Sequence, residues 1–213
     1  MVLGQLQTLL SDLYALDVSY DVDDFLVTDA GIARALDAGG RATEEKLLIA
    51  EEDGEAAVAL YLDAELMQRL GANNPTMQLG LGNLEDFWTA LEGVSHFLYY
   101  VFNAALEKSV TLLEMELQAE VDKFVGTALL LRRQGARLPA NLHSCLFDLP
   151  RFDGRLGAQE LARYRSANRY AGKYCKRLTQ RLSATGDPGA LRRELCYFYR
   201  LPQPGKLEHI GTA

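Results

Sequence analysis

The chain has 213 residues, of which 48% are hydrophobic and 24% are charged, and its formal net charge is −7. These values are ordinary for a soluble globular protein and supply enough apolar material for a core without disulfide staples. The N-terminus lacks the basic start of a signal peptide, and no apolar run reaches the roughly 18 residues of a membrane span. We therefore expect no membrane partner.

The cysteine pattern indicates the cellular compartment. Cys145, Cys175 and Cys196 are odd in number, widely spaced and free of any CxxC arrangement. Such cysteines are typical of reduced core thiols, so we expect a cytoplasmic protein without a disulfide framework.

The charge is unevenly divided along the chain. Residues 1–130 hold 6 Lys+Arg against 23 Asp+Glu, whereas residues 131–213 hold 16 Lys+Arg against 6 Asp+Glu. Asymmetry of this size carries information about partners. The basic part either docks on the acidic part, in the same chain or in a second copy, or faces an outside polyanion. Two solvated surfaces of opposite charge are the simpler alternative.

The first 83 residues predict short helices and one hairpin. The spacing of leucines in residues 3–16 is that of an amphipathic helix, and Thr28 or Asp29 can cap a short helix over 30–38 that stops at Gly39–Gly40. Two apolar runs flank Asp53–Gly54, which predicts antiparallel strands at about 46–52 and 56–62. Asp63 then caps a helix that runs through Leu70.

The remaining residues predict a helical bundle. Two long helices, about 84–106 and 111–133, have a short link and should form an antiparallel hairpin, the second starting with a Thr111–Glu114 capping box. A short helix follows Gly135, and further helices cover 158–183 and about 189–199. The proline-containing tail, LPQPGKLEHIGTA, is predicted to lie extended over the surface.

These elements predict an α+β, predominantly α-helical fold of one domain, residues 1–213. A small antiparallel β-hairpin or sheet lies near the N-terminus, within an acidic α+β part of about 1–83. A helical bundle follows over about 84–213, and its C-terminal third is basic.

The first long helix carries a narrow polar seam. At 100° per residue, six polar side chains fall within an arc of about 60°, and the rest of the circumference is largely apolar. The six are Glu85, Thr89, Glu92, His96, Asn103 and Glu107. We therefore expect this helix to be buried on most sides.

The seam is the candidate site. Glu92 and His96 are four residues apart, and the next helix brings Glu116 and Glu120 with the same spacing. Two antiparallel helices with such pairs could hold a divalent metal, because carboxylates and an imidazole suit Zn, Mn or Fe. Glu92 and His96 are also the candidate catalytic pair, since Glu92 could position His96 as a general base. A buried structural network and a solvent-facing edge are the alternatives.

The helix over 158–182 is basic on one side. Five cations, Arg165, Arg169, Lys173, Lys176 and Arg177, cover the arc opposite its apolar seam, and Tyr170 and Tyr174 border it. This face predicts contact with a protein partner or a second copy. Nucleic-acid binding is a further possibility, but it is not favoured, because a dedicated nucleic-acid binder is usually basic overall.

No complete catalytic motif is present: the sequence contains no GxSxG, no Walker loop, no Rossmann fingerprint and no HExxH. The first functional hypothesis is therefore a non-enzymatic interaction or assembly protein that uses its basic, Tyr/Arg-rich C-terminal region. The alternatives are a metal-dependent enzyme with the Glu/His site, for which hydrolysis is one reaction class, and nucleic-acid binding through the basic helix.

Overall fold

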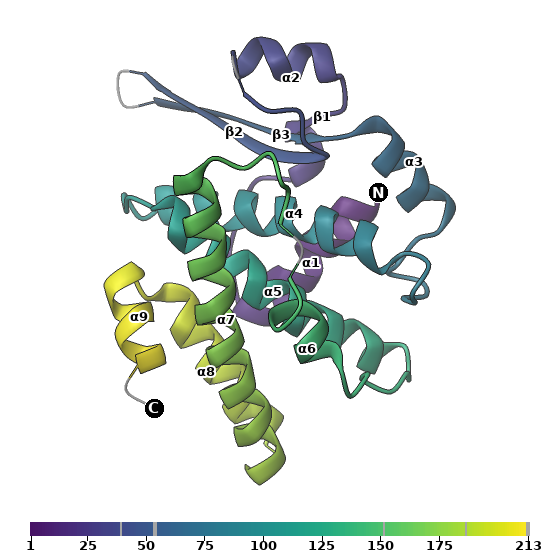
Figure 1. The fold of residues 1–213 in the computed structure, drawn as a ribbon, viewed down its shortest axis with the longest axis vertical. Coiled ribbons are helices and arrows are strands. Elements are labelled where there is room, and N and C mark those ends of the chain that lie inside the picture. The colour runs from purple at the N-terminus through teal and green to yellow at the C-terminus, as the bar shows by residue number, and fades with distance from the viewer. Residues whose placement is uncertain (39, 53–54, 151, 186, 212–213) are drawn as a thin grey trace.

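A computed structural model describes residues 1–38, 40–52, 55–150, 152–185 and 187–211 of the chain. It confirms the predominantly helical α+β fold. A small sheet lies over one side of a helical bundle, and a short helix lies beyond the sheet on its outer side (Figure 1). The order of layers is therefore helix, sheet and bundle.

The sheet has three strands in the order β1-β3-β2 and is mixed, not purely antiparallel. The predicted hairpin strands are present as β2 (Glu45–Glu52) and β3 (Glu55–Leu62), which pair antiparallel. Asp53–Gly54, the predicted turn, falls outside the described residues. The additional strand β1 (Leu26–Val27) pairs parallel with β3. It has only two residues, too few to show an alternating pattern in the sequence.

The helices follow the sequence pattern closely. The predicted helices are all present, with ends that differ from the expected ones by a few residues, as is usual for helix termini. In chain order the helical elements are α1 (Val2–Tyr14), the 3₁₀ turn η1 (Val22–Phe25), α2 (Ala30–Leu36), α3 (Ala64–Ala72), α4 (Leu84–Ala104), α5 (Leu112–Arg133), α6 (Leu142–Phe147), α7 (Ala158–Thr185), α8 (Pro188–Arg200) and α9 (Gln203–Gly211).

The α4–α5 hairpin forms the centre of the bundle. Its antiparallel register is visible in three side-chain contacts along its length: Trp88 with Thr127, Ser95 with Asp122, and Tyr99 with Glu114. The predicted capping box is present, because the Thr111 side chain accepts from Glu114 N and the Glu114 carboxylate accepts from Thr111 N. Most of α4 is buried, as its narrow polar arc indicated.

Two expectations were wrong. The C-terminal tail is not extended but forms α9, whose Lys206 and Ile210 are buried. Pro204 permits this helix, because a proline in the first turn removes no helical hydrogen bond. The three cysteines are free, but only Cys175 is buried, while Cys196 is half-buried and Cys145 is exposed.

Within the described part of the chain, no helix combines the length and apolarity that crossing a membrane requires.

Candidate metal centre

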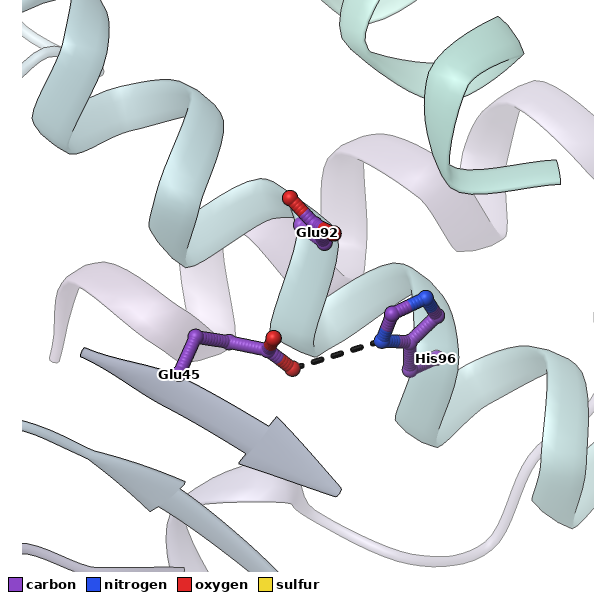
Figure 2. Close-up of side chains that lie close together, drawn as sticks. All are labelled: Glu45, Glu92 and His96. Carbon is purple, nitrogen blue, oxygen red and sulfur yellow. Dashed lines mark hydrogen bonds and ion pairs between the residues drawn. The ribbon is translucent and has the colours of Figure 1, made fainter. Parts of the chain in front are cut away.

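The candidate site lies where the sheet meets the bundle. Glu45 stands at the start of β2, and Glu92 and His96 lie one turn apart on α4, so the three side chains converge from two elements (Figure 2). Glu45, Glu92 and His96 each offer one potential ligand atom, and these atoms lie within 4.8 Å of one another. His96 Nδ1 is 3.3 Å from Glu45 Oε1. The imidazole is 8% exposed, so the site is nearly closed to solvent.

A glycine allows this close approach of strand and helix. Gly93 follows Glu92 and is buried on the side of α4 that faces the sheet. A Cβ atom at Gly93 would lie 2.9 Å from Leu60 Cδ1 and 3.0 Å from Glu45 Cγ, both shorter than ordinary van der Waals contacts. The absence of a side chain at this position is therefore what lets Glu45 reach His96.

A second layer of charged groups holds the first one in place. Lys123 on α5 lies 2.6 Å from Glu92 Oε2 and 3.0 Å from Glu120 Oε1. On the other side of the imidazole, Glu116 Oε2 is 3.7 Å from His96 Nε2, and Arg163 Nε on α7 is 3.6 Å from Glu116 Oε1. His96 Nε2 is buried and makes no hydrogen bond with any described residue. Four elements, β2, α4, α5 and α7, thus contribute to one cluster.

The cluster contains more negative than positive fixed charge. Its four carboxylates are those of Glu45, Glu92, Glu116 and Glu120, and its two fixed cations are Lys123 and Arg163. With a neutral imidazole, the formal charges of two carboxylates remain uncompensated. Unpaired charge is costly in a mostly buried position, so the cluster favours the uptake of positive charge.

The pKa values of the cluster reflect this excess. Burial raises the pKa of Glu45, and it raises the pKa of Glu116 to about 7 although the charge of His96 opposes the shift. Burial disfavours the imidazolium of His96, but the hydrogen bond to Glu45 and the surrounding carboxylates prevail and raise its pKa to about 9. Metal ligands must be deprotonated, so a cation would displace protons from this cluster.

The structure rearranges the ligand set expected from the sequence. Glu92 and His96 are together, as expected, but their nearest additional carboxylate is Glu45. Glu116 lies on the far side of the imidazole, and Glu120 turns to Lys123 and to Asn168, whose Nδ2 is 3.0 Å from Glu120 Oε2. Sequence reasoning missed Glu45 because it lies 51 residues from His96, so no local spacing links the two.

The basic helix is only partly as expected. Arg165, Arg169, Lys173 and Lys176 are exposed. Tyr174, in contrast, is fully buried and stacked on Phe198 with ring centroids 3.8 Å apart, so it does not belong to the exposed face.

The other two members of the expected face, Arg177 and Tyr170, are half-buried. Arg177 donates to the backbone oxygen of His209 on α9, so this cation holds the chain's own C-terminal helix.

A separate buried network lies on the opposite side of α5, and nothing in the sequence indicated it. Asp122 accepts hydrogen bonds from Tyr14, Ser95 and Gln118. Lys206 of α9 is completely buried and donates to Gln118 Oε1 at 2.7 Å. Its ammonium group also lies 4.3 Å from the ring centroid of Phe198. This network fixes α9 against the bundle.

Comparison with known proteins gives no relative: no family model matches the chain, and no match was found among curated proteins or solved structures.

Proposed function

We propose that this protein binds one divalent metal ion through Glu45, Glu92 and His96. The observation that carries the proposal is the convergence of two carboxylates and an imidazole, from β2 and α4, within 4.8 Å of one another. This mixture of oxygen and nitrogen ligands suits Zn²⁺, Mn²⁺ or Fe²⁺. One divalent ion would also compensate the two uncompensated carboxylate charges of the cluster.

The groups around the three ligands support the same role. Ligating histidines commonly donate their second ring N–H to a carboxylate, which fixes the ring orientation. Glu116 lies on the side of that second nitrogen, with Oε2 3.7 Å from His96 Nε2, so a small movement would bring it within hydrogen-bond distance. Lys123 contacts Oε2 of Glu92, which leaves Oε1 of the same carboxylate for the ion. The surrounding residues would thus orient the ligands without replacing the ion.

The reaction class that fits such a centre is metal-assisted hydrolysis. Three protein ligands would leave coordination positions for water, as in catalytic zinc sites. A substrate would reach them only when the site, whose imidazole is 8% exposed, opens. A centre that binds the ion but is inactive on model esters would instead have a structural role, in which the ion ties the sheet to the bundle.

Metal titration of untagged, chelator-treated protein tests the proposal. The wild type should bind about one Zn²⁺ or Mn²⁺ per chain and melt at a higher temperature with the ion, because binding to the folded state alone stabilises it. Glu45→Gln and Glu92→Gln should each weaken binding by at least about tenfold, in the range typical for lost metal-site contacts. Glu85→Gln, an exposed position on the same helix, is the matched control.

Two results would contradict the proposal. One is wild-type protein that binds neither ion, and the other is an equal affinity in Glu92→Gln and Glu85→Gln. Hydrolysis is tested separately with p-nitrophenyl acetate and bis(p-nitrophenyl) phosphate. The metal-loaded wild type and metal-loaded Glu85→Gln should hydrolyse these esters at the same rate within assay error. Both rates should clearly exceed that of Glu92→Gln.

A further inference from the structure

Helix α7 presents a row of cations that no acidic group among the described residues neutralises. Residues 161–181 contain seven basic and no acidic residues. Among these, Arg165, Arg169, Lys173 and Lys176 are exposed, and none of the four has an ion pair within the described parts of the chain. At 100° and 1.5 Å per residue they span an arc of about 80° and a length of about 16 Å. We call these four residues the α7 stripe.

The stripe points away from the bundle because the other side of α7 is buried. Ala167, Ala171, Cys175 and Leu178 are at most 4% exposed and belong to the hydrophobic core. Helix α7 packs on α5 and α6 with this side, and it extends beyond the bundle alongside α8 (Figure 1). The sequence allowed the basic part to dock on acidic surface of the same chain, but the α7 stripe is not covered in this way.

A surface of the opposite charge lies at the other end of the sequence. Residues 1–33 contain six aspartates and no lysine or arginine. Asp17, Asp21 and Asp24, in the segment from α1 to η1, are exposed and have no ion pair among the described residues. We call these three residues the acidic segment. In Figure 1, α1 lies behind the α4–α5 hairpin and α7 in front of it, so the two surfaces cannot neutralise each other within one chain.

We propose that the α7 stripe binds the acidic segment of a second copy of this chain. The two surfaces differ, so the contact is heterologous, from the head of one copy to the tail of the next. Charge complementarity favours this occupant over a nucleic acid, because the protein as a whole carries a charge of −7 and its acidic segment would repel a phosphate backbone. The proposal is independent of the metal centre.

The contact should be weak and strongly dependent on salt. Ion pairs between exposed side chains contribute little individually, and their attraction is screened over about 8 Å at physiological ionic strength. We therefore expect association at about 20 mM salt and its loss at about 500 mM, where the screening length is several-fold shorter.

Sedimentation velocity with charge-reversal variants tests the proposal. Arg165→Glu/Lys173→Glu and Asp17→Lys/Asp24→Lys change side chains that have no hydrogen bond or ion pair in the described structure, so both variants should fold. Each should be monomeric at 20 mM salt. The chain that carries all four changes should associate again, because its α7 stripe then carries acidic residues and its acidic segment carries lysines, so the two surfaces again differ in sign. Lys108→Glu/Arg137→Glu, at exposed sites outside the stripe, controls for net charge and should associate like the wild type.

Each alternative outcome overturns the proposal. A wild type that stays monomeric at 20 mM salt and millimolar concentration removes the second copy as occupant. Equal loss of association in Lys108→Glu/Arg137→Glu means that net charge, not the stripe, governs it. If the fourfold variant stays monomeric while folded, the two surfaces do not meet. If the wild type is monomeric but shifts generic single-stranded RNA, and Arg165→Glu/Lys173→Glu does not, the stripe binds nucleic acid.

Discussion

The substitution Gly93→Ala tests whether the close approach of β2 to α4 builds the metal centre. The new Cβ would lie 2.9 Å from Leu60 Cδ1 and 3.0 Å from Glu45 Cγ. Carbon atoms pack best at about 3.5–4.0 Å, so the Leu60 and Glu45 side chains, or the strand that carries Glu45, must move away by about 0.5–1 Å. Because Glu45 carries one of the three ligands, this movement should disturb metal binding more than folding.

Two opposing effects set the change in stability. Replacing glycine by alanine inside a helix stabilises it by about 1 kcal/mol, whereas overpacking a well-filled core costs about 1–3 kcal/mol. We therefore expect a net loss of about 1 kcal/mol in the free energy of unfolding, which corresponds to about 2–4 °C in Tm for a chain of this size. Zinc affinity should fall by about tenfold or more, as for other losses of ligand orientation.

The assays are urea unfolding of the ion-free protein and zinc titration by calorimetry. Gly126→Ala is the matched control: its Cβ would meet Leu91 Cδ2 at 2.8 Å, also in the core of the hairpin, but no residue of the metal centre. This control should lose a similar amount of stability and keep wild-type zinc affinity. If Gly93→Ala binds zinc as tightly as Gly126→Ala does, the close approach of the sheet to α4 does not position Glu45 for metal binding.

Two further predictions concern stability elsewhere in the fold. Burial lowers the pKa of Lys206 to about 7, against the charges of Asp122 and Glu114, so between about pH 7 and pH 10.5 the folded state binds fewer protons than the unfolded state. The contribution of Lys206 to the free energy of unfolding therefore rises with pH over that range. In urea-unfolding experiments, Lys206→Met should make the free energy of unfolding rise less steeply with pH. An unchanged dependence on pH would contradict a lowered pKa of Lys206. Thr111→Ala removes the N-cap of α5 and should lower the free energy of unfolding by about 1 kcal/mol. Thr89→Ala, within α4, should change it by less than about 0.5 kcal/mol, and equal effects of the two substitutions would refute the importance of the cap.

Local patterns in the sequence determined most of the fold. The leucine spacing of α1, the apolar circumference of α4 and the Thr111–Glu114 capping box each depend on residues within a few positions of one another, so they can be read without tertiary structure. The same holds for the pairing of β2 with β3, because the two strands are adjacent in the chain. The helical form of α9 could not be read in this way, since Lys206 is stabilised by Gln118, 88 residues away.

In the candidate sites, too, some features follow from local sequence and others from tertiary packing. The i,i+4 pair of Glu92 and His96, and the row of cations on α7, follow from helical periodicity alone. Only the tertiary structure decided that Glu45, 51 residues from His96, completes the proposed metal centre, that Glu120 contacts Lys123, and that Tyr174 is buried. The physical reason is that periodicity fixes which side chains share a face of one element, whereas the packing of separate elements fixes what that face meets.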